Sequence, residues 1–145
     1  MNKDLHNSIS VCVMREAADY TANANSNLLN RTGFESCEIL VAVGALQGVD
    51  GSNYLVISLQ ECDTTAGTSF TNVATTDLLG AFTKIDATSE DSIIQRVGYL
   101  GNKKYLRVVL TETGSITTGS IIGVYAILGN ARHQVATDVT AVSAT

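Results

Sequence analysis

The chain has 145 residues, which suits one domain with a hydrophobic core of its own. Hydrophobic residues make up 45% and charged residues 16% at a net charge of −5, which excludes an intrinsically disordered chain. No apolar run approaches the roughly 18 residues of a membrane span, and residues 1–10 lack the apolar stretch of a signal peptide. We therefore expect synthesis in a cytoplasm and no membrane partner.

Apolar side chains that alternate with period two predict β-strands along the chain. The clearest runs are Cys37 to Ala45, Leu55 to Leu59 and Ile122 to Leu128. With the turn signals between them, the pattern predicts about eight strands, near residues 9–14, 18–23, 36–46, 53–62, 69–74, 92–100, 103–112 and 119–128. Eight antiparallel strands in about 120 residues are typical of an all-β, jelly-roll-like sandwich. An immunoglobulin-like sandwich is the alternative.

The two ends of the chain lack a strong periodicity. Residues 1–8 are polar, and residues 130–145 contain neither a regular apolar pattern nor a turn cluster. We interpret residues 1–145 as one sandwich domain, with arms at 1–8 and 130–145. Such arms are either flexible or docked on a neighbour.

Few residues suggest chemistry. The three cysteines, Cys12, Cys37 and Cys62, form no close pair, so neither a disulfide framework nor a zinc site is expected. The sequence has no P-loop, no G-x-S-x-G and no G-x-G-x-x-G, and its two histidines, His6 and His133, lie in the arms. We therefore expect no catalytic residues, no cofactor and no metal.

Positive charge gathers around the stretch VGYLGNKKYLRVVL, residues 97–110. Residues 1–95 carry four Lys or Arg and twelve Asp or Glu, hence −8, whereas residues 96–145 carry five and two, hence +3. Gly101-Asn102 reads as a two-residue hairpin loop that places Arg96 opposite Arg107, and a three-residue loop would instead pair Tyr99 with Tyr105.

Three interpretations of this basic stretch remain open. It is a nucleic-acid surface, a solvated hairpin whose lysines guard a sheet edge, or a docking surface for an acidic partner or for the acidic part of another copy. The acidic composition disfavours nucleic acid as a partner.

Several segments occur in an order that resembles a known family. They are "ILVAVGAL", then "YLVISLQECD", then "QRVGYLGNKKYLRVVLTETGSITTGSIIGVYAILGNARHQ". In this order they look like a small protein commonly encoded among the head genes of tailed bacteriophages. The resemblance covers roughly residues 33–133, and its most specific part is the basic stretch with the closing strand.

The resemblance implies a capsid cement or decoration protein of the jelly-roll type. Such a protein would sit on the outside of the virion as a homodimer or homotrimer and bridge neighbouring major capsid protein subunits. The candidate residues for the capsid or oligomer interface are then Arg96, Lys103, Lys104, Arg107, Arg132 and His133. The alternative is a phage spike, fibre or carbohydrate-binding module that recognises a host surface.

Overall fold

Strands dominate the computed structural model, which describes residues 5–20, 22–65, 69–116 and 120–132. The strands are β1 (Ile9–Tyr20), β2 (Ala24–Asn25), β3 (Leu29–Asn30), β4 (Phe34–Val43), β5 (Tyr54–Cys62), β6 (Thr71–Asn72), β7 (Leu78–Leu79), β8 (Ile93–Tyr99), β9 (Tyr105–Thr113) and β10 (Ser120–Ala131). Short 3₁₀ helices, η1 (His6–Ser8), η2 (Thr75–Asp77) and η3 (Thr88–Glu90), precede β1, β7 and β8. No helix in the described ranges is long and apolar enough to span a bilayer.

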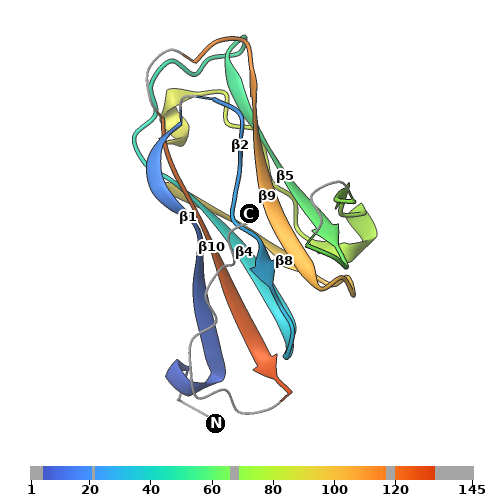
Figure 1. Cartoon of the computed structure of the whole chain (residues 1–145). Coiled ribbons are helices and arrows are strands. Elements are labelled where there is room, and N and C mark those ends of the chain that lie inside the picture. Colours follow the sequence, from blue (N-terminus) through green and yellow to red (C-terminus); the bar gives the residue numbers. More distant parts are fainter. Residues whose placement is uncertain (1–4, 21, 66–68, 117–119, 133–145) are drawn as a thin grey trace.

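The strands form two antiparallel sheets that pack as a sandwich (Figure 1). Sheet A has the order β1-β10-β4-β8-β7, and sheet B has the order β2-β9-β5-β6, with β3 also paired to β9. If β2 and β3 are taken as one interrupted strand and the short β7 is set aside, the first strand pairs with the eighth and the second with the seventh. The third likewise pairs with the sixth and the fourth with the fifth. This nested pairing is that of a jelly roll, so the predicted fold class is confirmed.

The predicted hairpin around Gly101-Asn102 is wrong, because β8 and β9 lie in different sheets. The connection between them crosses the end of the sandwich from one sheet to the other. Arg96 therefore lies opposite Leu40 of β4, and Arg107 lies opposite Gln60 of β5. The two arginines do not face each other, in contrast to what the two-residue loop predicted.

The first predicted strands, at 9–14 and 18–23, are one continuous strand up to Tyr20. Irregularities in the pairing of β1 with β10 lie between Val13 and Arg15 and between Arg15 and Ala18. An irregularity of this kind bends a strand without ending it. Of the predicted arms, Leu5–Ser8 lead into β1, and Asn130 and Ala131 continue β10. Residues 1–4 and 133–145 lie outside the described residues.

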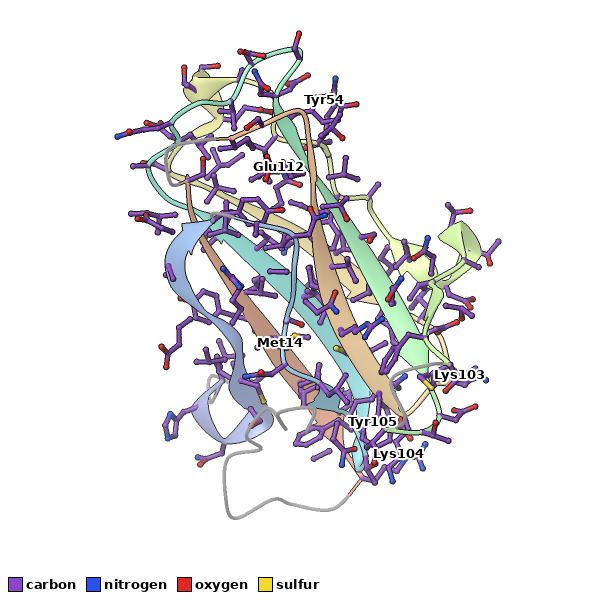
Figure 2. The ribbon with its side chains drawn as sticks, turned by 45° about the horizontal axis from the view of Figure 1, so that its top comes forward. Met14, Tyr54, Lys103, Lys104, Tyr105 and Glu112 are labelled. Atoms are coloured by element: carbon purple, nitrogen blue, oxygen red, sulfur yellow. The ribbon has the colours of Figure 1, made fainter. Side chains whose placement is uncertain are left out.

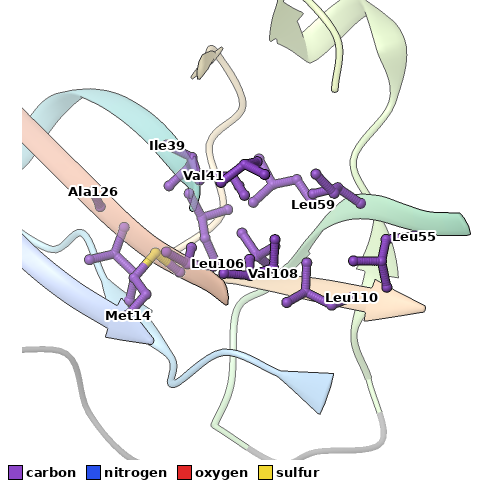
Figure 3. Packing of buried hydrophobic residues seen from close by; sticks show 14 of the residues in the cluster. Met14, Ile39, Val41, Leu55, Leu59, Leu106, Val108, Leu110 and Ala126 are labelled. Carbon is purple, nitrogen blue, oxygen red and sulfur yellow. The ribbon is translucent and has the colours of Figure 1, made fainter. Parts of the chain in front are cut away.

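The core fills the space between the sheets (Figure 3). Alternate residues of β10, from Ile122 to Leu128, are fully buried, as are Leu106 and Val108 of β9. The period of two places one set of side chains between the sheets and leaves the other set outside. Burial of a Leu, Ile or Val side chain stabilises the fold by about 1.5–3 kcal/mol. The core thus holds the strand ends, and the side chains that follow them, in fixed positions.

Candidate functional site

Four basic residues meet at one end of the sandwich because of the strand directions. Arg31 follows β3, Lys103 and Lys104 precede β9, and Arg132 follows β10. The register places Asn30 opposite Tyr105 and Ala131 opposite Phe34, so that these connections lie at the same end of the molecule. Figure 2 shows Lys103 and Lys104 beside Tyr105 at this end, with Tyr54 at the other end.

These residues line a shallow hollow of about 190 Å³, which we call the basic hollow. Its lining residues are Arg31, Thr32, Gly33, Phe34, Asn102, Lys103, Lys104 and Arg132. Among the described residues, the lining thus contains four cations and no carboxylate. Positive charges gathered around a concave surface favour the binding of an anionic group within it.

Arg31 is the most firmly held of the four cations. Its Nη1 donates to the carbonyl oxygen of Gly101 at 2.5 Å and more weakly to that of Lys103 at 3.4 Å. Its guanidinium carbon lies 4.9 Å from the centre of the Tyr99 ring, within the range of a cation–π contact. Its Nε is buried and has no hydrogen-bond partner in the described part of the chain. Arg31 therefore joins β3 to the β8–β9 connection and keeps its charge beside the hollow.

Tyr99 supports the floor of this region. Its hydroxyl donates to Oε2 of Glu61 and accepts the backbone N–H of Lys103 at 3.0 Å. Burial, followed by the bond to the Glu61 carboxylate, raises the pKa of Tyr99. A β-carbon at Gly101 would lie 2.4 Å from the Tyr99 hydroxyl, so only glycine fits there without displacement of the ring. This packing fixes the path of the chain that carries Lys103.

The cations differ in how far acidic neighbours balance them. Lys103 Nζ lies 2.6 Å from Asp63, and Arg132 Nε lies 3.2 Å from Glu35, both in exposed ion pairs. The Asp63 carboxylate raises the pKa of Lys103, so this side chain keeps its charge. Among the described residues, neither Arg31 nor Lys104 forms an ion pair. Lys104 Nζ instead lies 5.1 Å from the centre of the Tyr105 ring.

The structure separates the other predicted interface residues. Arg96 lies on the outer face of sheet A, 3.9 Å from Glu38. Arg107 lies on the outer face of sheet B, where it donates to Gln60 at 2.9 Å and covers the Phe70 ring at 4.2 Å. His133 lies outside the described residues. Lys103, Lys104 and Arg132 thus belong together, whereas Arg96 and Arg107 lie on opposite faces.

The outer face of sheet A is unusually apolar. We define the apolar face as Val11 and Val13 of β1, Ile121, Tyr125 and Ile127 of β10, Leu40 and Ala42 of β4, Ile94 of β8 and Leu79 of β7. Val13 is 47% exposed, Ile94 67% and Leu79 60%. Apolar side chains this exposed and this contiguous typically mark an interaction surface on a soluble protein.

No reactive centre stands out in the described residues. All three cysteines are buried thiols that form no disulfide in the described part of the chain, and burial raises the pKa of the Cys37 thiol to about 12. Hydrogen bonds from Ser69 and Thr64 lower the pKa of Cys62, and the nearby Lys103, with which it interacts electrostatically, is itself paired with Asp63. Within the described ranges, no three His, Cys, Asp or Glu side chains gather as metal ligands.

Two features of these surfaces escaped the sequence analysis. Arg31 was not predicted, because its place beside Lys104 depends on the pairing of β3 with β9. The apolar face was visible only in part, as strands whose two faces are both apolar, such as β1 and β10. That pattern indicates that both faces are covered, without showing what covers the outer one. No protein-family model and no curated protein matches the chain.

Proposed function

We propose that this chain is a non-enzymatic structural protein of a virion, which binds the outside of a phage capsid and cements neighbouring subunits of the major capsid protein. The jelly roll supports this proposal, because it is a common fold of viral capsid domains, although it also occurs in lectins and cupins. The fold alone is therefore compatible with several functions, and the function has to be argued from the surface.

The basic hollow is the observation that carries the proposal. Four cations line it, and in the described chain no carboxylate does. Arg31 is held by carbonyl oxygens and by the Tyr99 ring, so that little side-chain freedom is lost when an anionic group arrives. Carboxylate side chains on the shell are the groups that this hollow suits. An otherwise acidic protein would then approach the shell with this end first, because attraction at this end sets the orientation.

Mass action gives the mechanism of cementing. A protein that binds two neighbouring shell subunits, and binds them only when they are assembled, stabilises the assembled state. Such a role needs shape and charge complementarity and no catalytic group. It also needs a rigid body between the contacts, and the two sheets supply one.

The test uses capsids assembled without this chain. Purified protein is added, the particles are sedimented, and the bound copies per shell are counted at several salt concentrations. We expect saturable binding at a fixed ratio to the capsid protein, weaker at high salt because the contact is electrostatic.

Charge reversal separates the basic hollow from other surfaces. Lys103→Glu combined with Lys104→Glu should lower capsid affinity at least about tenfold, since like charges then face each other across the contact. Lys84→Glu is the matched control, because Lys84 is exposed and paired with Asp86 away from the hollow. Equal occupancy for the double variant and the wild type would contradict the assignment of the hollow, and absence of binding by the wild type would contradict the function.

A further inference from the structure

The two outer faces of the sandwich differ in chemistry. The outer face of sheet B carries polar side chains such as Ser58, Gln60, Arg107 and Thr111, and Val56 is its one strongly exposed large apolar residue among those described. The apolar face of sheet A has Val11, Val13, Ile94, Ile121 and Leu79 at 39–67% exposure. Antiparallel sheets normally keep the solvated face polar, so the outer face of sheet A is built to be covered.

The apolar face has the size of a protein interface. Four strands spaced about 4.8 Å apart and ten residues long at about 3.3 Å per residue span on the order of 600 Å². A standard interface buries roughly 800 Å² on each partner. The face is also hollowed by about 360 Å³ over Gly98 and Gly129, between Leu79 and Ile127, so that side chains of a partner have a place to enter.

The charges on this face complement each other. Glu38 and Arg96 lie 3.9 Å apart within it, and Arg96 is 77% exposed. Two further acidic residues lie towards its ends: Asp19, opposite Ile121, and Glu35, which lines the same hollow as Glu38. The Glu38–Arg96 pair therefore presents one charge of each sign, whereas the lining of the basic hollow presents one sign only. A surface that carries one charge of each sign matches a copy of itself that is turned by a two-fold rotation.

We propose that a second copy of this chain packs on the apolar face, sheet A against sheet A, around a two-fold axis that passes between Glu38 and Arg96. Each Arg96 then lies opposite Glu38 of the other copy. Packed sheets lie about 10 Å apart, and the small side chain of Ala42 and the hollow beside Gly129 allow this approach. The basic hollow lies at the end of the sandwich and stays free on both copies.

The inference does not depend on the proposed function, because its first test uses the purified chain alone. Sedimentation velocity over a range of concentrations should show a reversible dimer. Val13→Lys and Ile94→Lys should each raise the dimer dissociation constant about tenfold or more, since each places a charge within the buried patch. Val56→Lys on the outer face of sheet B is the matched control and should leave it unchanged. Denaturant unfolding of each variant verifies that it is folded.

A charge-exchange experiment tests the two-fold geometry. Arg96→Glu alone places two acidic residues opposite each other at both contacts of the dimer, and Glu38→Arg alone places two basic residues there. Both single variants should therefore dimerise more weakly than the wild type. Mixed together they should form a heterodimer preferentially, because each contact then joins opposite charges. An ion pair confined to one chain would give no such rescue.

Three results would overturn the proposal. One is a wild-type chain that stays monomeric up to its solubility limit. Another is a dimer that tolerates Val13→Lys and Ile94→Lys but not Val56→Lys. The third is a mixture of the two charge variants that associates no better than either variant alone. If the wild-type chain is monomeric and Val13→Lys abolishes its binding to capsids, the apolar face contacts the shell and not a second copy.

Discussion

The hydroxyl of Tyr99 ties the basic hollow to sheet B, and Tyr99→Phe tests that link. The substitution keeps the ring beneath Arg31 and its packing against Gly101. It removes the bond donated to the Glu61 carboxylate and the acceptor of the Lys103 N–H. The variant thus changes two hydrogen bonds and little else.

The expected loss follows from the two bonds. A bond to a charged group contributes about 1.5–3 kcal/mol and a neutral one about 1 kcal/mol. Glu61 is half-buried, so water replaces part of the first bond after substitution. We expect the free energy of unfolding to fall by about 2 kcal/mol, which for a chain of this length lowers Tm by roughly 6 °C.

Guanidinium unfolding measures this difference directly, with Tyr54→Phe as the control. Tyr54 lies at the opposite end, and its hydroxyl has no hydrogen-bond partner among the described residues, so its loss should cost less than about 0.5 kcal/mol. An unchanged midpoint for Tyr99→Phe, with an unchanged slope, would show that the Tyr99–Glu61–Lys103 contacts do not support this end of the sandwich.

Two further predictions concern the core and pH. Leu106→Ala should lower the free energy of unfolding by about 2–5 kcal/mol, because Leu106 is fully buried, whereas Leu79→Ala at 60% exposure should change it little; equal losses in denaturant titration would refute the assigned sheet faces. Burial, followed by the Glu112 carboxylate, raises the pKa of Tyr20 from 10.0 to about 12. The folded state therefore retains a proton that the unfolded state loses, so stability is full below pH 10 and falls as the pH rises to about 12. Tyr20→Phe should flatten this fall in unfolding curves recorded across that range, and an unchanged slope would contradict the assignment.

Strand positions were predictable where alternation is strong, as in β4, β5 and β10. The partners of those strands were not. The alternation assigns side chains to a face but carries no information about which strand lies alongside. Gly101-Asn102 looks the same in a hairpin as in a connection that crosses between sheets. A hairpin and a connection between sheets differ in which strand faces become buried against each other, and that depends on the whole chain.

The sequence predicted an excess of basic residues near the candidate site, but it did not predict where in the fold these residues meet. Lys103 and Lys104 stood out in the sequence, and Arg132 was noticed near the closing strand. Their meeting with Arg31 depends on β3 pairing with β9 and on β10 pairing with β4. These pairings join residues about 70 to 100 positions apart, as the bonds from Arg31 to Gly101 and from Arg132 to Glu35 illustrate. Local sequence patterns carry no information at that range.

The position of β10 between β1 and β4 has a consequence for biosynthesis. β1 and β4 are synthesised long before Ser120–Ala131; until β10 is made, β1 has no neighbour in sheet A and β4 has a neighbour, β8, on one edge only. Chains interrupted before Ser120 would keep two long apolar strands with open edges, the kind of surface that aggregates or is degraded. Sheet A is therefore assembled only in chains translated through β10, because β10 is the strand that joins β1 to β4.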